Sequence, residues 1–375
     1  METTELIGSQ WEYVLDMLPQ DLESSARAKL AIQRRRGIEY ASDLVRVILA
    51  YSVCDFSLRD LALWASTRGL GDLSAPALGK RLAKAADWVS YLVFSWLRDH
   101  GLNDQTPAVA VRVIDATVIS KPGSRGTDWR IHLGLDLASE RITSVEVTGP
   151  EGGETLVRHD VPAGQIILGD RGYAHRAGVA HALQAQDHVV LRINWQNFPL
   201  ATRSGEPVDL VARSLSLSEG QIADWPVQFE EQGQTYQMRV VAIRKSAAAA
   251  EAEQRRVIKL ARRKKREPDP RSLEAAHFIY LLTDLPPHRL RPKQALELYR
   301  LRWQIEIAFK RLKGLLDLDH LRARSPEAAA TYLYGKLLGA LLLDQLYTYA
   351  ESFFPWGFPL LHKTTEPLAV DEPVA

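Results

Sequence analysis

Two aspartates end short apolar segments, in the kind of position where carboxylates take part in catalysis. Asp115 ends the run VRVID and Asp170 ends the run QIILGD, with Gly172 close behind to allow a sharp turn. A carboxylate at the end of a buried strand loses hydration, and two of them on neighbouring strands repel each other. A divalent cation relieves both costs, and Mg²⁺ binds through carboxylate oxygens and substrate phosphates. An aspartate in such a place also often caps a helix or orders a turn, so neither residue decides the question alone.

A third acid, Glu306, lies in the stretch LYRLRWQIEIAFKRLK, residues 298–313. On a helical wheel with Tyr299 at 0°, Arg302, Glu306 and Lys313 fall near about 300°, 340° and 320°, an arc of roughly 60°. The opposite, core-facing side of the wheel holds the apolar residues: Leu298, Leu301, Ile305, Ala308, Phe309, Leu312, Leu315 and Leu316. The pattern predicts one helix over residues 292–317 with Glu306 at the edge of a core, flanked by cations. An amphipathic helix with a solvated salt bridge is the alternative.

Together the three acids are suited to phosphodiester chemistry. With two ions about 3.5 to 4 Å apart, one activates the attacking oxygen and the other stabilises the leaving oxygen. Glu306 would complete the site with Asp115 and Asp170. Tyr299, Arg302 and Lys313 would then bind nearby phosphates from the same helical stripe.

The order of these motifs resembles a known family. VIDAT, then GDRGY, then Y-x2-R-x3-E-x6-K resembles the DDE transposases of bacterial insertion sequences, specifically the insertion sequence four group with its Tyr-Arg-Glu signature. The resemblance covers residues 40–345, and its last motif is the most specific because all four spacings match. It implies that Asp115, Asp170 and Glu306 are the catalytic, metal-binding triad of a ribonuclease-H-like core, holding two Mg²⁺ ions per site, with Mn²⁺ as a substitute.

The same resemblance implies the reaction and the partners. It implies binding to the terminal inverted repeats of an insertion sequence, hydrolytic nicking, and attack of the freed 3′-hydroxyl on target DNA, in cut-and-paste transposition. Tyr299, Arg302 and Lys313 would hold phosphates near the cleaved end, and Arg171 would either contact a phosphate or order a turn. The partners would be double-stranded DNA of the ends and of the target. A homodimer is expected in the DNA complex, because two ends must be brought together.

The predicted helices and strands that position these residues divide the chain into five regions. Residues 1–105 read as a helical DNA-binding region, helix-turn-helix-like near 57–86, although two ordinary packed helices fit equally well. Residues 106–194 alternate strands and helices, which predicts an α/β layer architecture with a mixed sheet. Residues 195–290 interrupt it as a β-rich insertion domain with a basic helix, and residues 291–325 return to the core. Residues 326–375 are expected to form a C-terminal helix, which makes either a core or a dimer contact, followed by a loose tail.

Several single residues have competing interpretations. His132 is expected to be a hydrogen-bonded structural histidine rather than a ligand or base. Three aromatic residues of the insertion would be available to stack on a base flipped out of the DNA end, although packing in the sheet explains each of them better: Phe278, Tyr280 and Trp225. The run RRVIKLARRKKR, residues 255–266, places eight Lys or Arg in twelve positions, which either solvate a helix or meet phosphates.

Composition limits the class of protein. Of the 375 residues 46% are apolar, enough for a sizeable core, and the net charge is +1. The single cysteine, Cys54, excludes an internal disulfide framework and a zinc site of several thiolates, which fits the cytoplasm. The first 18 residues show no signal pattern, and the run LLGALLL, residues 337–343, is too short to span a bilayer, so no membrane role is expected.

Three alternative functions remain open at this level. A ribonuclease-H-like nuclease would cut without joining. A catalytically silent DNA-binding regulator derived from a transposase would be expected to lack a triad carboxylate, and all three are present. A glycosidase also uses paired acids, but the cations around Glu306 argue against it.

Overall fold

The computed structural model describes residues 11–33, 37–54, 56–100, 110–121, 123–124, 126–159, 163–321, 323 and 325–353. The tail predicted to be loose lies outside the described residues. So does the basic triplet at 34–36.

Helices fill the described residues between 11 and 100, where no strand occurs. Their bounds are α2 Trp11–Asp16, α3 Leu22–Ala28, α4 Ala41–Val53, α5 Leu58–Thr67, α6 Ala75–Lys84 and α7 Ala86–His100. Ser57 caps α5 by accepting a hydrogen bond from the Asp60 backbone N–H at 3.2 Å, and Pro76 lies in the first turn of α6. The helix-turn-helix prediction corresponds to α5 and α6, which pack against each other.

An eight-stranded mixed sheet forms the centre of the molecule, and its order is β3-β2-β1-β4-β5-β8-β7-β6. The bounds are β1 Val111–Ile119, β2 Trp129–Asp136, β3 Ile142–Thr148, β4 Ile166–Gly169, β5 His188–Arg192, β6 Ile222–Glu231, β7 Gln234–Arg244 and β8 Phe278–Thr283. Strands β1, β4 and β5 are parallel, and the other pairings are antiparallel. The expected mixed α/β architecture is therefore confirmed.

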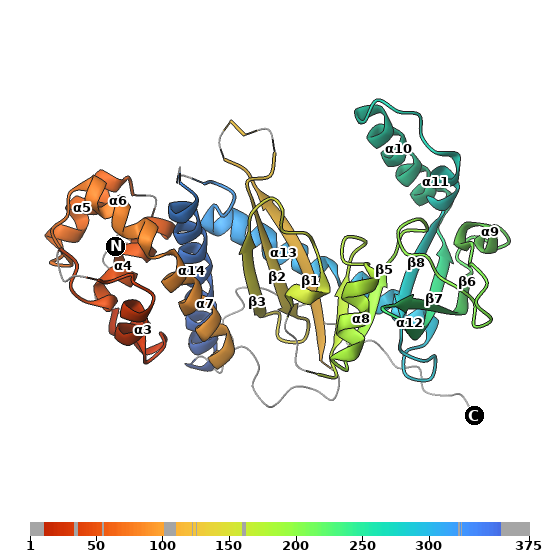
Figure 1. Cartoon of the computed structure of the whole chain (residues 1–375), viewed down its shortest axis with the longest axis horizontal. Coiled ribbons are helices and arrows are strands. Elements are labelled where there is room, and N and C mark those ends of the chain that lie inside the picture. Colours follow the sequence, from red (N-terminus) through yellow and green to blue (C-terminus); the bar gives the residue numbers. More distant parts are fainter. Residues whose placement is uncertain are drawn as a thin grey trace.

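Helices cover both faces of this sheet, and Figure 1 shows α8 in front of it and α13 behind it. Helix α8, Arg176–Gln184, makes the crossover from β4 to β5, and the short 3₁₀ helix η1, Leu156–Arg158, lies against it. The opposite face carries α12, Pro292–Arg300, and α13, Trp303–Leu316. Alternate residues of the central strands feed two separate hydrophobic clusters, because successive side chains point to opposite faces.

The β-rich region predicted at 195–290 is not a separate sheet. Strands β6, β7 and β8 extend the central sheet, since β8 pairs antiparallel with β5. Its helices are α9 Leu210–Ser214, α10 Ala247–Arg263 and α11 Pro270–Ala275. In Figure 1, α10 and α11 stand above β8 at the upper right, so residues 255–263 of the basic run lie on a helix above the sheet, and residues 264–266 follow its end.

Helix α14, Pro326–Phe353, lies beside α7, and these two helices stand between the other N-terminal helices and the sheet (Figure 1). It packs against α4, α6, α7 and β3, and the LLGALLL run is largely buried there. This run is thus part of the core. None of the helices in the described part of the chain has a stretch that is both long and apolar enough to cross a bilayer.

Candidate active site

Asp115 lies on β1, and Asp170 directly follows β4, the parallel strand beside it. Val113 of β1 pairs with Leu168 of β4, and each aspartate follows two residues later, so continuing this register places them level and on the same face. Local backbone groups hold each carboxylate. Asp115 accepts the N–H of Ala116 at 2.8 Å, and Asp170 accepts the N–H of Gly172 at 2.7 Å.

Arg302 joins the first and third acids of the predicted triad. Its guanidinium donates to Asp115 Oδ2 at 3.0 Å and to Glu306 Oε1 at 2.6 Å. The Arg302 and Asp115 side chains are each only 18% exposed, whereas Glu306 is 51% exposed. The expectation that Glu306 lies at the edge of a core beside a cation is thus met, and the cation also reaches β1.

The single helix predicted over 292–317 is wrong, because the chain forms two helices that meet at Leu301 and Arg302. At the junction, the N–H groups of Arg302 and Ile305 bond to carbonyls three residues back, as in a 3₁₀ turn. The uniform wheel therefore fails there. Leu301 is 41% exposed and Leu315 is 81% exposed, although both were placed on the core-facing side. Glu306 and Lys313 both lie within α13, so their predicted placement on one stripe of the helix still holds.

The end of α13 is anchored by a buried lysine of α14. Lys336 is 1% exposed, and its ammonium donates to the carbonyls of Leu316 and Asp317, the latter at 2.7 Å. A cation at a helix C-terminus satisfies orphan carbonyls and complements the helix dipole. This contact fixes the helix that carries Glu306.

A fourth acid shares this part of the molecule. Burial raises the pKa of the Asp115 carboxyl to about 6; the Ala116 N–H and Arg302 oppose the shift, while Asp170 and Glu154 add to it. Burial and then the charge of Asp170 raise the pKa of Glu154. Sequence reasoning missed Glu154, because an acid after two glycines in a loop carries no recognisable signal.

The donor atoms around these acids suit a hard divalent cation. They are carboxylate oxygens that are partly desolvated and repel one another, which is the setting in which such a cation binds. Within the described ranges, however, no three acidic, histidine or cysteine side chains are grouped closely enough to hold a metal. In this structure the Arg302 guanidinium pairs with Asp115 and with Glu306.

The predicted DNA-binding residues are spread over this site. Arg171 follows Asp170 directly and pairs with Glu253 of α10 at 3.5 Å. The Arg302 guanidinium lies 6.0 Å from the centre of the Tyr299 ring. Lys313 lies two turns beyond Glu306 on α13 and is half-buried.

Further cations beside Asp170 were missed by sequence reasoning. Leu191 of β5 pairs with Gly169, which places Arg192 level with Asp170. Burial lowers the pKa of Arg192, and the nearby charges of Arg171 and Arg256 lower it further. Burial likewise lowers the pKa of Lys245 to about 8. These residues come together only through the order of strands in the sheet, so no sequence motif predicts this group of cations.

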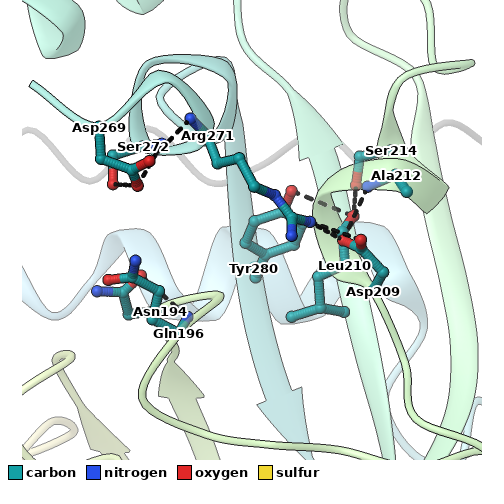
Figure 2. Close-up of polar contacts among 10 residues, drawn as sticks. All are labelled: Asn194, Gln196, Asp209, Leu210, Ala212, Ser214, Asp269, Arg271, Ser272 and Tyr280. Atoms are coloured by element: carbon teal, nitrogen blue, oxygen red, sulfur yellow. Dashed lines mark hydrogen bonds and ion pairs between the residues drawn. The ribbon is translucent and has the colours of Figure 1, made fainter.

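The aromatic candidates for base stacking are packing residues. Phe278 and Tyr280 are each 3% exposed, and Trp225 is half-buried against the same cluster. Figure 2 shows the Tyr280 hydroxyl directed at the carbonyl of Leu210, to which it donates at 3.4 Å. Beside it, Arg271 binds both carboxylate oxygens of Asp209.

His132 has the structural role that was predicted. It is fully buried, and its Nε2 lies 3.0 Å from the Thr148 hydroxyl. Burial lowers its pKa to about 4, so the ring is neutral near pH 7.

Comparison with known proteins assigns the chain to a family. A family model described as a transposase DDE domain matches residues 109–343. The putative transposase InsL for insertion sequence element IS186A of Escherichia coli strain K12 is 34% identical over 354 residues, covering 92% of this chain and 96% of the relative. The transposase for insertion sequence element IS421 of Escherichia coli is 34% identical over 355 residues, with the same coverage. The chain therefore belongs to the DDE-domain transposases.

This membership confirms the resemblance to bacterial insertion-sequence transposases and gives the activity. The chain is a DNA transposase, an enzyme that cleaves DNA and transfers strands, and enzymes of this family use divalent metal ions. The alternatives of a joining-deficient nuclease, a silent regulator and a glycosidase are not favoured. A cryo-EM structure of the piggyBac transposase synaptic complex with hairpin DNA aligns with a TM-score of 0.40 at 11% identity, covering 93% of this chain and 80% of that chain.

Proposed function

We propose that Asp115, Asp170 and Glu306 form the catalytic metal site of a ribonuclease-H-like core. The observation that carries this proposal is the Arg302 bridge from Asp115 to Glu306, with Asp170 level with Asp115 on the next strand. The strand order β3-β2-β1-β4-β5, antiparallel and then parallel, supports the core assignment.

The three carboxylates would hold two Mg²⁺ ions, or Mn²⁺ in their place. When bound, the ions activate the attacking oxygen and stabilise the leaving oxygen of the phosphodiester. Arg302 would be released from the acids and turn to a DNA phosphate, which a guanidinium binds with paired hydrogen bonds.

The cations beyond Asp170 would bind the DNA backbone leading to the site. Arg171, Arg192, Lys245 and Arg256 influence one another's charge, and Glu253 is the acid among them. Such a cluster is costly unless an anion offsets it, and a phosphate chain supplies that charge. Tyr299, Arg302 and Lys313 would hold the cleaved end from the other side.

The remaining parts would serve the assembly. Helices α5 and α6 would bind the terminal inverted repeats, with Lys80 and Lys84 exposed on α6 and Arg81 held by its bond to the Ala31 carbonyl at 3.2 Å. Two chains would pair the ends as a homodimer for cut-and-paste transposition in the cytoplasm.

The reaction is tested with a supercoiled plasmid that carries the element's ends, incubated with target DNA and Mg²⁺. We expect joined products from the wild type, and neither cleavage nor joining from Asp115→Asn, Asp170→Asn or Glu306→Gln, each with end binding retained. Glu297→Gln, an exposed acid on α12, is the matched control. Cleavage by any triad variant at the rate of this control would remove that residue from the catalytic site.

The proposed backbone path is tested at Arg192. Arg192→Met should weaken DNA binding evenly across sequences and reduce the slope of log affinity against log salt by about 1, as expected for one lost phosphate contact. Arg213→Met alters an exposed arginine on α9 and should keep the wild-type slope. If Arg192→Met keeps the wild-type slope of log affinity against log salt, Arg192 does not contact a DNA phosphate and the proposed backbone path is wrong.

A further inference from the structure

Glu154 is held in place by its loop. The loop between β3 and η1 is bound on both sides of this residue, because Arg130 of β2 donates to the Gly152 carbonyl at 2.8 Å and Arg158 donates to the Gly153 carbonyl at 2.9 Å. Thr155 then caps η1 by accepting the N–H of Val157. Two arginines and a helix cap thus direct the Glu154 side chain to one location.

That location is beside Asp170. A Cβ added at Gly172 would come within 3.0 Å of oxygens from both the Glu154 and the Asp170 carboxylates. The backbone at Gly172 is not left-handed, so the glycine is needed for its missing side chain rather than for its flexibility. The space at residue 172 is therefore kept open for two carboxylates to approach.

A buried hydroxyl without a partner faces the same acids. Tyr173 is fully buried, and within the described residues its hydroxyl has no hydrogen-bond partner. Burial raises the Tyr173 pKa, and the charges of Asp115, Glu154 and Asp170 raise it further, so the hydroxyl is exposed to the charge of all three carboxylates without bonding to any of them. A buried hydroxyl left without a partner costs stability, so a polar group that bonded to Tyr173 would be stabilising.

We propose that Glu154 is a fourth carboxylate of the metal centre and helps to hold the ion bound by Asp170. This inference rests on the proposed function of Asp115 and Asp170 as metal ligands. A third desolvated carboxylate beside two others adds repulsion when no metal ion is present, and the charge of Arg130 offsets only part of the shift that burial and Asp170 cause at Glu154. A divalent cation held by these carboxylates would balance their charges.

The test measures Mn²⁺ binding to the full-length protein without DNA, by electron paramagnetic resonance of free Mn²⁺ and by calorimetry. Glu154→Gln keeps the shape and removes the charge, and we expect Mn²⁺ affinity to fall about tenfold or more. In EDTA this variant should melt at a higher temperature than the wild type, because one repelling charge is gone. Glu151→Gln changes an exposed acid in the same loop and should match the wild type in both measurements.

Gly172→Ala supplies an independent variant, because its Cβ would displace the Glu154 carboxylate without removing its charge. We expect weaker Mn²⁺ binding from it as well. If Glu154→Gln binds Mn²⁺ with wild-type affinity, the proposal for Glu154 is overturned. If Asp170→Asn loses Mn²⁺ binding in the same assay, the proposed metal centre of Asp115, Asp170 and Glu306 still stands, without Glu154 as a ligand. A wild-type protein that binds no Mn²⁺ would overturn both.

Discussion

Arg302 makes a specific prediction, because one guanidinium neutralises two acids that come from different parts of the chain. Arg302→Met removes the charge and keeps an unbranched, helix-compatible side chain. Asp115 then remains largely buried without a countercharge, and Glu306 loses its partner four residues back. We expect this variant to be destabilised in the absence of divalent metal.

The magnitude follows from the exposure of each pair. Arg302 and Asp115 are each 18% exposed, and removing one partner of a buried pair costs about 3 to 5 kcal/mol. Glu306 is 51% exposed, so its pair contributes less than about 1 kcal/mol. A loss of about 3 kcal/mol would lower the melting temperature by about 5 °C in a protein of this size.

The assay compares melting temperatures in EDTA and in Mg²⁺, with Arg300→Met as control. Arg300 lies two residues earlier and is exposed, so its substitution should leave the melting temperature within about 1 °C. Mg²⁺ supplies the missing positive charge, and at 100 times its Kd a ligand stabilises by about 2.7 kcal/mol. Arg302→Met should therefore gain more from Mg²⁺ than Arg300→Met, in which Arg302 still competes for the acids.

Two results would refute this reasoning. Equal melting temperatures of the two variants in EDTA would mean that the Arg302 bridge contributes nothing to stability. Equal gains in Mg²⁺ would mean that Arg302 does not occupy the place of a cation. A double-mutant cycle with Asp115→Asn separates the pair from other effects, and we expect a coupling energy of about 2 to 3 kcal/mol.

Three further predictions concern stability and are read from urea midpoints. Lys336→Met removes the ammonium donor from the Leu316 carbonyl and leaves the Asp317 carbonyl with only the N–H of His320, so it should cost about 2 to 3 kcal/mol; an unchanged midpoint would refute its anchoring of α13. Arg239→Met removes the 2.8 Å pair with Asp224 and two bonds to carbonyls, so a loss of about 3 to 5 kcal/mol is expected, and a loss below 1 kcal/mol would contradict it. Burial holds the pKa of Lys245 at about 8, below its ordinary 10.5, so its charge costs stability below pH 8 and this cost disappears towards pH 10.5. Lys245→Met removes this cost together with the 2.7 Å bond to the Ala276 carbonyl, so its effect on stability should be about 1 to 2 kcal/mol more favourable at pH 7 than at pH 10.5, and an effect independent of pH would exclude this cause.

The local sequence pattern was sufficient to predict the mixed α/β architecture and the protein family. Alternating and apolar runs predicted a mixed sheet with helices, because side-chain periodicity reflects which face of an element is buried. The spacing from Tyr299 to Lys313, after VIDAT and GDRGY, carried the resemblance that the family match confirmed. The structural role of His132 also followed from its place within a strand.

Tertiary structure alone decided which side chains meet. The helix wheel assumed a continuous α-helix, and the turn at Leu301 and Arg302 broke that assumption and left Leu301 exposed. The pairing of β8 with β5 merged the predicted insertion into the central sheet. Neither a junction between helices nor a strand pairing across a long stretch of chain is set by the residues within it.

The sequence by itself determined three acids, their order and the chemistry that such acids perform. It did not determine that Arg302 bridges Asp115 and Glu306, that Arg192 stands level with Asp170, or that Glu154 approaches Asp170 over Gly172. These contacts join residues far apart in the chain. They depend on strand register and loop path, which are fixed by packing of the whole domain rather than by any local signal.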